Sequence, residues 1–461
     1  MFLTLVATLG GLLFGYDTAV ISGTVKYLEI NFVAPLSLEE TAASSLLGFA
    51  VSSALIGCIL GGLVGGYMAN RFGRKRSLMI AAVLFIVSAI GSAYPEMGFG
   101  SGEMHRFLTH FIVYRIIGGI GVGMASVLSP MYIAEMAPAS RRGGLVAWNQ
   151  FAIIFGMLVV YFVNYAIALS GDEAWLTNTG WRLMFLSEVV PAALLLILVT
   201  LVPESPRWLI MRGREKDALQ VLKRINDAQG AQKEAEAIRV SFSQVIRSKL
   251  FTYGVTVIVV GILLSVFQQF IGINVVLYYA PEIFRNMGMG TNAALAQTII
   301  VGIINLSFTV LAIFTVDRFG RKPLMIIGSI GMAVSMFTLG MAFYTHSMGI
   351  VALLAMLCYV ASFAMSWGPI CWVLLSEIFP NPIRSQAMAL AVAAQWIANY
   401  LVSWTFPMMD KSSYLIEHFN HGFAYWIYAL MAILSALFMW RCVPETKGKS
   451  LEQMETLFPK K

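Results

Sequence analysis

Long apolar runs alternate with short polar segments along nearly the whole chain of 461 residues. A run of about 20 apolar residues is long enough to cross a bilayer as a helix. The pattern predicts an all-α membrane protein with twelve transmembrane helices. Their expected ranges are 3–25, 44–69, 77–94, 111–134, 145–169, 182–202, 250–280, 293–316, 323–344, 350–375, 385–406 and 423–443.

A polar interval, 203–249, separates the sixth apolar run from the seventh. It mixes ten basic with six acidic residues, and patches such as 215–225 have helical spacing. We expect short surface helices here that link two halves of the protein, and a merely solvated linker is the alternative.

Composition and charge support a membrane protein. Hydrophobic residues make up 58% of the chain and charged residues 12%, and the mean hydropathy is +0.77, all far from the values of soluble enzymes. Of the 31 Lys and Arg residues, 25 fall in alternate loops that include 203–249 and the C-terminal segment. The positive-inside rule then places these loops and both termini in the cytoplasm, which makes the linker helices cytoplasmic. The six remaining basic residues are Lys26, Arg106, Arg115, Arg182, Arg285 and Lys411.

The two groups of six helices repeat one another. The sequence from Asn70 to Lys75 follows the second span, and its near copy from Asp317 to Lys322 follows the eighth. Such repeats are typical of secondary transporters, whose ligand site lies between the halves. We therefore divide the chain into a half at 1–202, linker helices at 203–249, a half at 250–443 and a tail at 444–461.

The segment from Phe267 to Pro281 carries polar side chains inside an apolar run. Lipid tails offer no hydrogen-bond partners, so such side chains face the protein interior, a ligand or a water-filled cavity. Gly272 lies among them and allows the helix to bend, so that both ends can face one cavity. The group indicates a polar ligand site, although each residue alone could equally hold helices together. The polar residues are Gln268, Gln269, Asn274, Tyr278 and Tyr279.

Four motifs together resemble the sugar porter family of the major facilitator superfamily. They are PESPRWL at 203–209, QQxxGxNxxxYY at 268–279, GPxxW at 368–372 and PETKGKS at 444–450. The resemblance extends over essentially the whole chain. It implies the major facilitator fold, with twelve transmembrane helices in two pseudo-symmetric six-helix halves, and alternating access to a sugar site between them.

By this resemblance the sugar site draws on six different spans. Amide groups would pair with sugar hydroxyls, and aromatic rings would pack on the C–H face of the sugar. Met157 is a departure, because the resemblance leads us to expect glutamine there in a pentose carrier, whereas hexose carriers tend to be apolar. The expected sugar-binding residues are Phe14, Gln150, Gln268, Gln269, Asn274, Tyr278, Asn305, Gly368, Trp372, Gln395 and Trp396.

Two opposite charges, Asp17 and Arg115, lie within the first and fourth spans. Burial favours the neutral form of a carboxyl group and a nearby guanidinium favours the charged form, so a change in their distance would switch protonation. We hypothesise that Asp17 carries a coupled proton, that Arg115 tunes it, and that Glu188 in the sixth span belongs to the same network. A static ion pair is the alternative.

Charged residues at the cytoplasmic ends of the spans could form a lock between the halves. A network made only in the outward-open state would bias a two-state equilibrium. The alternative is that these charges only set the topology. The residues are Arg74, Glu135, Arg142 and Glu204 in the first half, and Arg321, Glu377, Arg384 and Glu445 in the second.

The resemblance implies a proton-coupled symporter in the bacterial cytoplasmic (inner) membrane that imports a pentose, D-xylose in the first place, with D-glucose as a competitor. One alternative is a hexose or polyol carrier, either facilitative or proton-coupled, and Asp17 argues against the facilitative form. The other alternative is a transport-dead sugar sensor. We expect no enzyme activity, since no nucleophile–base pair or metal-ligand set is found. The expected partners are a sugar, protons and the lipid bilayer, with no nucleic acid, cofactor or metal.

Overall fold

The computed structural model describes residues 2–100, 102–137, 142–225, 227–243, 250–251, 254–380 and 383–447. Throughout these ranges the regular elements are helices, and twelve of them are long and apolar enough to cross a membrane. The prediction of an all-α protein with twelve spans is confirmed.

The first half contains six spans, of which the sixth is interrupted. Short helices join some of the spans at one end: α2 (Val25–Leu28), α7 (Glu173–Trp175) and the turns η1 to η4 and η6 between 21 and 180. The spans are α1 (Phe2–Val20), α3 (Glu40–Phe72), α4 (Arg74–Ala93), α5 (Leu108–Met136), α6 (Arg142–Ala168) and the pair α8 (Trp181–Leu186) and α9 (Val189–Leu201).

The second half repeats this plan, with two interrupted spans. A short helix, α20 (Ser413–Phe419), precedes the last one. The spans are the pair α13 (Val255–Phe270) and α14 (Ile273–Asn286), then α15 (Thr291–Phe319), α16 (Arg321–Tyr344), the pair α17 (Ile350–Met365) and α18 (Trp367–Ile378), α19 (Arg384–Asp410) and α21 (Gly422–Cys442).

The repeat extends to the backbone. Gly73 joins α3 to α4 with φ +93° and ψ 167°, and Gly320 joins α15 to α16 with φ +90° and ψ 161°. Both turns need a positive φ, which glycine adopts without steric cost. The pseudo-symmetry predicted from the repeated motifs is therefore present in the fold.

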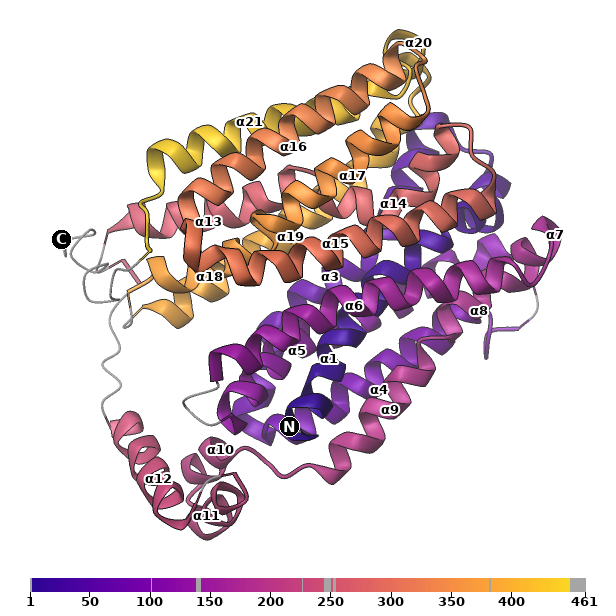
Figure 1. Cartoon of the computed structure of the whole chain (residues 1–461). Coiled ribbons are helices and arrows are strands. Elements are labelled where there is room, and N and C mark those ends of the chain that lie inside the picture. The colour runs from indigo at the N-terminus through magenta and orange to yellow at the C-terminus, as the bar shows by residue number, and fades with distance from the viewer. Residues whose placement is uncertain are drawn as a thin grey trace.

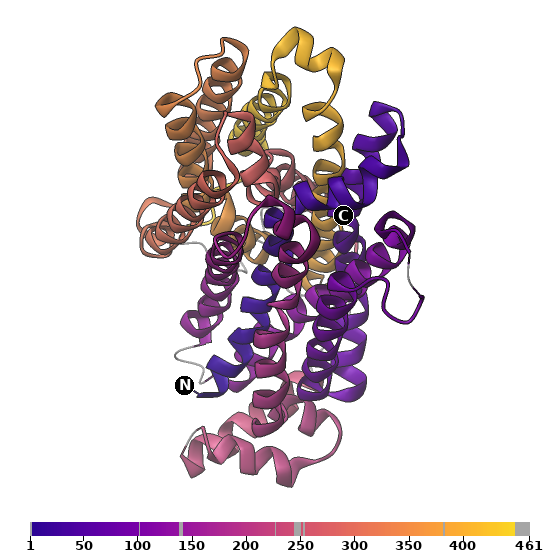
Figure 2. The ribbon, with the colours of Figure 1, turned by 90° about the vertical axis from the view of Figure 1, so that its right-hand side faces the viewer.

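Three short helices follow the first half, namely α10 (Pro206–Met211), α11 (Glu215–Lys223) and α12 (Ala228–Ser243). They lie across one end of the bundle, which we call the linker end, and the opposite end is the distal end (Figures 1 and 2). Trp208 Nε1 and Arg212 Nη2 donate to the Asn70 carbonyl at 2.9 and 3.0 Å, so α10 caps carbonyls that the end of α3 leaves unpaired. The predicted linker helices are present.

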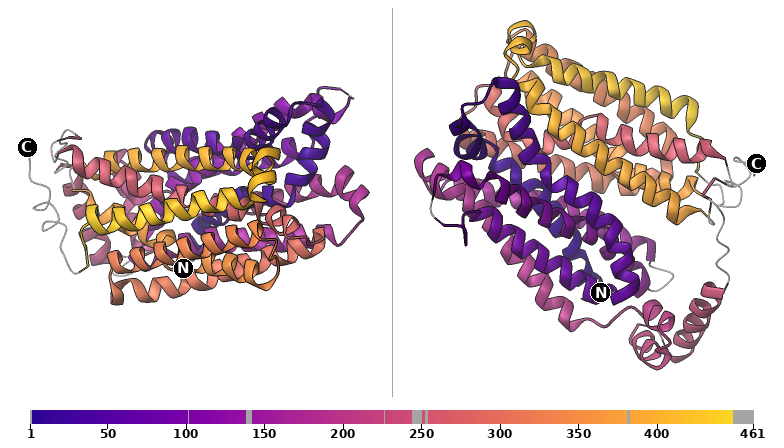
Figure 3. Two further views of the ribbon diagram at one scale, coloured as in Figure 1. Left: turned by 90° about the horizontal axis from the view of Figure 1, so that it is seen from above. Right: turned by 180° about the vertical axis from the view of Figure 1, so that it is seen from behind.

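The two halves pack against each other along α3 and α19, along α6 and α15, and where α1 meets α14. They approach each other at the distal end and diverge toward the linker end (Figures 1 and 3). Among the side chains that bond across the halves, Trp404 Nε1 donates to the Ser45 carbonyl at 3.0 Å, and the Tyr161 hydroxyl donates to the Leu277 carbonyl at 2.9 Å. The contact surface between the halves is therefore the place where a site shared by both can form.

Candidate functional site

The seventh span breaks at Gly272, between α13 and α14. Gly272 has φ +90° and ψ 15°, and a Cβ there would lie 2.7 Å from the ring of Tyr428. The Tyr359 hydroxyl donates to the Ile271 carbonyl at 2.7 Å, which pairs a group that the break would otherwise leave free. The break separates Gln268 and Gln269 from Asn274 and Tyr278, as the sequence predicted.

The tenth span breaks at Ser366, between α17 and α18. Pro369 has no N–H with which to continue the helical hydrogen bonds, which favours an interruption here. Gln268 Nε2 donates to the Trp367 carbonyl at 2.8 Å and approaches the Gly368 carbonyl at 3.4 Å. The amide of Gln268 therefore joins the two interrupted spans of the second half.

A chain of amides continues from Gln268. Gln269 Nε2 donates to Gln268 Oε1 at 3.4 Å, and Asn274 Nδ2 donates to Gln269 Oε1 at 2.5 Å. Both glutamines are buried and Asn274 is half-buried. The break at Gly272 thus brings three predicted sugar ligands together with the carbonyl of a fourth predicted residue, Gly368.

The eleventh span adds aromatic and amide groups. The rings of Phe14 and Trp396, one from each half, have centroids 5.6 Å apart. Asn399 Nδ2 approaches the Tyr278 hydroxyl at 3.4 Å, and its Oδ1 accepts from Ser403 Oγ at 3.1 Å. The sequence analysis missed Asn399, although an amide one helical turn after Gln395 and Trp396 in an apolar span was a usable signal.

Four predicted residues make neither a hydrogen bond nor a ring contact with the rest of the group within the described part of the chain. Asn305 is buried, Gln150 and Gln395 are half-buried, and the Gln395 Oε1 atom is buried with no donor. Trp372 on α18 is 36% exposed. These side chains have free hydrogen-bonding groups or ring surface with which to meet a ligand.

A buried charge network lies in the first half. Arg115 Nη1 donates to Asp17 Oδ1 at 2.8 Å, and the exposed fractions of Asp17, Arg115 and Glu188 are 0%, 1% and 0%. Arg115 also lies over the ring of Phe185, 5.5 Å from its centroid. The three residues expected to couple protons are therefore in one buried region.

Glu188 lies where the sixth span is interrupted between α8 and α9. Pro191 cannot donate to the Ser187 carbonyl, which explains the local loss of helical bonding. Both Glu188 carboxylate oxygens and Asp17 Oδ2 are buried and have no donor among the described residues. Glu188 is within electrostatic range of Asp17 and Arg115, and among the described residues the guanidinium forms its ion pair with Asp17 alone. A proton on either carboxyl group would supply the missing hydrogen bond.

The helix that carries Asp17, α1, packs against α14 of the second half, which carries Asn274 and Tyr278. Tyr278 is within electrostatic range of Asp17, Arg115 and Cys58. Because Tyr278 belongs to α14 and Asp17 to α1, this proximity depends on how the halves pack.

At the linker end, matching ion pairs form inside each half. Arg74 pairs with Glu135 at 2.8 Å, and Arg321 pairs with Glu377 at 3.0 Å. Ser205 and Thr446 donate to the same two carboxylates, each at 2.5 Å. The repeat therefore holds at the level of single atoms, and these four charged residues stabilise their own half in this conformation.

Two further carboxylates accept backbone N–H groups where α4 and α16 begin. Glu204 Oε1 accepts from Arg74 N at 2.9 Å, and Glu445 Oε1 accepts from Arg321 N at 3.2 Å. Burial raises the pKa of Glu204, whereas for Glu445 the opposing effect of the backbone donors is larger than that of burial and lowers the pKa. Arg384 Nε donates to the Phe379 carbonyl at 3.1 Å, and the Arg142 side chain lies outside the described residues.

The distal end is held closed by polar contacts between the halves. Lys411 pairs with Glu29, Ser413 donates to Glu40, and Thr291 donates to Glu173. The three carboxylates belong to the first half and the three donors to the second. The sequence analysis did not predict this arrangement.

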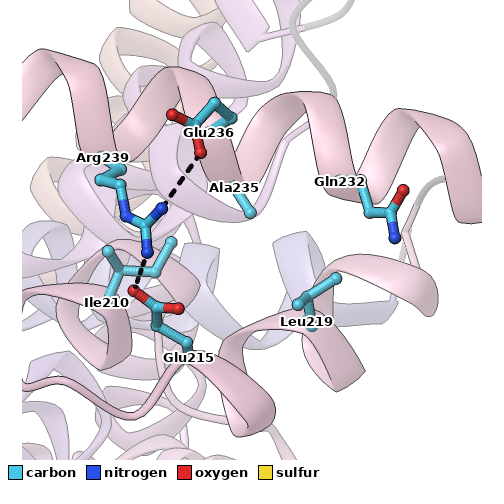
Figure 4. Close-up of a pocket in the computed structure, with 7 residues that line it drawn as sticks. All are labelled: Ile210, Glu215, Leu219, Gln232, Ala235, Glu236 and Arg239. Carbon is cyan, nitrogen blue, oxygen red and sulfur yellow. Dashed lines mark hydrogen bonds and ion pairs between the residues drawn. The ribbon is translucent and has the colours of Figure 1, made fainter.

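A surface cavity lies between the linker helices. Arg239 bridges Glu215 at 2.8 Å and Glu236 at 3.4 Å beside it (Figure 4). Its position on α10 to α12 places it away from the contact between the halves, so it is not the predicted ligand site.

Comparison with known proteins agrees with the fold. The model of the sugar (and other) transporter family matches residues 3–458. The chain belongs to this family, and it is a transporter and not an enzyme.

Among its relatives is the D-xylose-proton symporter of Escherichia coli strain K12, which is 63% identical over 466 residues, covering 99% of this chain and 95% of that protein. The inward open conformation of the E. coli xylose transporter has a TM-score of 0.91 at 61% identity and covers 99% of both chains. The proton:xylose symporter of the major facilitator superfamily bound to 6-bromo-6-deoxy-D-glucose has a TM-score of 0.84 at 63% identity, covering 99% of this chain and 98% of that one.

Proposed function

We propose that this chain is a proton-coupled symporter that imports D-xylose by alternating access. The observation that carries the proposal is the buried network of Asp17, Arg115 and Glu188, with two carboxyl groups and one guanidinium, beside an amide-rich group in the opposite half. A facilitative carrier has no need of such a network, because keeping unpaired charge inside a protein is costly. The relative named as a D-xylose-proton symporter supports the same reading.

In this proposal Asp17 is the group that takes up the coupled proton. Arg115 Nη1 lies 2.8 Å from Asp17 Oδ1 and stabilises the charged carboxylate, and Glu188 lies within electrostatic range of the same guanidinium. Any motion that weakens the Asp17–Arg115 contact favours the protonated acid, since the guanidinium is what stabilises the charge. The same rotation of the halves would change the contact between α1 and α14.

Sugar would bind between the halves, against the amides of the seventh span and the paired rings of Phe14 and Trp396. The amide chain from Gln268 to Asn274 would offer donors and acceptors to sugar hydroxyls, and the two rings, tilted by 45° to each other, would offer apolar faces for the C–H groups of the sugar. We assign the remaining predicted ligands, Gln150, Tyr278, Asn305, Gly368, Trp372 and Gln395, to the same site.

The size of the preferred sugar depends on Met157. Its side chain is 8% exposed on α6, and Gly15 of α1 packs against its backbone. An apolar group here removes one donor and one acceptor for a hydroxyl, which favours a hexose or polyol as the second candidate. The relative bound to a glucose derivative shows that a symporter of this kind accommodates a hexose-shaped ligand.

We further propose that the linker end faces the cytoplasm, with both termini there, and that the membrane is the bacterial inner membrane. The distribution of 25 among 31 basic residues supports this orientation. With the distal end closed by contacts between the halves, the conformation described here is then inward-facing. The lock that we predicted across the cytoplasmic ends would form when the halves close there, with Arg74, Glu135, Arg321 and Glu377 exchanging partners within their half for partners in the other.

The test is sugar-induced proton uptake into proteoliposomes without an imposed gradient. D-xylose, D-glucose and an inositol are added separately, and the external pH is recorded. Alkalinisation with D-xylose alone supports the proposal, and alkalinisation with another sugar keeps the mechanism but changes the substrate. Asp17→Asn is expected to lose uphill accumulation while retaining sugar exchange down a gradient. Sugar entry with no proton signal would refute the role of Asp17.

A further inference from the structure

The two interrupted spans of the second half are hydrogen-bonded to each other at both breaks. Gln268 of α13 donates to the Trp367 carbonyl at the α17–α18 break, at 2.8 Å. Tyr359 of α17 donates to the Ile271 carbonyl at the α13–α14 break, at 2.7 Å. The Ile271 carbonyl at the end of α13 lies outside the helical hydrogen bonds, and its donor comes from the other interrupted span. The Trp367 carbonyl belongs to the first residue of α18 and accepts the Gln268 amide as a side-chain donor. The two breaks are therefore linked by a pair of reciprocal hydrogen bonds.

Tyr359 is well placed to fix the first break. Its side chain is fully buried, and its hydroxyl reaches the last residue before Gly272. The position of Ile271 determines where Gln268 and Gln269 lie relative to Asn274. Since Gln269 and Asn274 are bonded at 2.5 Å across the break, a small change in the bend would separate them.

We infer that Tyr359 is a positioning residue for sugar binding, which touches no sugar itself but holds the α13–α14 break in the geometry that brings Gln268, Gln269 and Asn274 together. Because Gln268 also donates to the Trp367 carbonyl, the amide that is expected to bind sugar also holds the start of α18. When a sugar engages the Gln268 amide, the bond from Gln268 to the Trp367 carbonyl is lost, and α18 becomes free to move relative to α13. The inference rests on the proposed sugar site.

The chain offers a matched control for this residue. Tyr428 is also a buried tyrosine at the same break, and its ring packs on Gly272. Among the described residues, however, its hydroxyl has no hydrogen-bond partner. Tyr359→Phe and Tyr428→Phe therefore remove the same atom from neighbouring places, and only the first removes a bond to the break.

The experiment is calorimetric titration of the purified full chain in detergent with D-xylose and with D-glucose, followed by exchange kinetics in proteoliposomes. Tyr359→Phe leaves the buried Ile271 carbonyl without a donor, and we expect the sugar Kd of this variant to rise about fivefold to tenfold. The sugar Kd of Tyr428→Phe should stay within about twofold of that of the unaltered chain. In exchange, KM rises with Vmax little changed. A purely structural defect would instead reduce the number of binding sites and Vmax, and would leave the Kd of the remaining sites unchanged.

Equal Kd values for the two variants, alongside normal binding by the unaltered chain, would overturn the inference and leave the proposed function standing. The same conclusion follows if Tyr359→Phe lowers only the number of sites. Absence of saturable binding of either sugar by the unaltered chain would overturn the proposed function, and the inference with it.

Discussion

Gly272 is the residue whose replacement tests the site most directly. Its φ of +90° lies in the left-handed region, where a residue with a Cβ loses about 1–2 kcal/mol. A Cβ would also lie 2.7 Å from the Tyr428 ring, and overpacking of this kind costs about 1–3 kcal/mol. Gly272→Ala therefore disfavours the bent conformation by roughly 2–5 kcal/mol.

That energy has a consequence for binding, because only the bent span brings the amides on both sides of the break together. If the chain relieves the strain by changing the bend, the sugar affinity falls by the same energy. Even the lower figure corresponds to about a 30-fold rise in Kd, since about 1.4 kcal/mol is a factor of ten. The assays are sugar titration and thermal unfolding of the purified protein.

Two other glycines separate the contributions. Gly288 has φ +88° but nothing within 4 Å of an added Cβ, so Gly288→Ala measures the backbone cost alone. Gly66 lies within helix α3 and has nothing within 4 Å either, so Gly66→Ala should have almost no effect. A Gly272→Ala protein with an unaltered sugar Kd and a thermal shift no larger than that of Gly288→Ala would refute the reasoning.

Three further predictions concern the two ends of the molecule. Lys411→Met breaks the ion pair with Glu29 between the halves and is expected to lower the ratio of distal-closed to distal-open conformers by up to about fivefold. Distances between spin labels on the two halves at the distal end would measure this ratio, and an unchanged ratio would contradict a gating role. The hydrogen bond with Asp410 raises the pKa of His421, with burial opposing it, so this pair stabilises the fold fully below about pH 6.5 and loses that contribution as the pH rises through the folded-state value. His421→Gln should flatten thermal stability between about pH 6 and 8. For Glu445, burial raises the pKa, but the backbone donors together lower it by more, so the net shift is downward. The stabilisation of the fold by this carboxylate is therefore present above about pH 4.5 and is lost as the pH falls. Glu445→Gln should lower the unfolding temperature by a few degrees at about pH 7 and by much less in acid.

Local signals in the sequence were sufficient for the helices, the repeat and the break at Gly272. Apolar length determines where a chain can cross a membrane, and a glycine among polar residues marks a place where a helix can bend. The assignment of Phe14 and Trp396 to one site came from resemblance to a family, because the two residues are far apart in the chain and no spacing rule joins them, and their ring contact was not predicted.

Other features could not be predicted because they depend on which side chain meets which carbonyl. Tyr359 and Asn399 were polar residues in apolar spans, and nothing in the sequence identified their partners. Lys411 was one of six basic residues left over from the topology argument, and only the packing of the halves brings it to Glu29. Contacts between residues hundreds of positions apart are set by the tertiary arrangement and not by local pattern.

The packing of the halves also suggests how sugar and proton sites can affect each other. Asp17 and Arg115 belong to the first half, whereas Tyr278 is on α14 of the second and lies within their electrostatic range. Tyr278 is held from its own half by Asn399, and the neighbouring Leu277 carbonyl is held from the first half by Tyr161 at 2.9 Å. In the proposed alternating-access motion, separation of the halves at the distal end would break this last bond and move α14 away from α1. The charge network would then lose a polar neighbour as the distal side opens, so the protonation of the proposed proton site and the shape of the proposed sugar site would change in one motion without any group that touches both ligands.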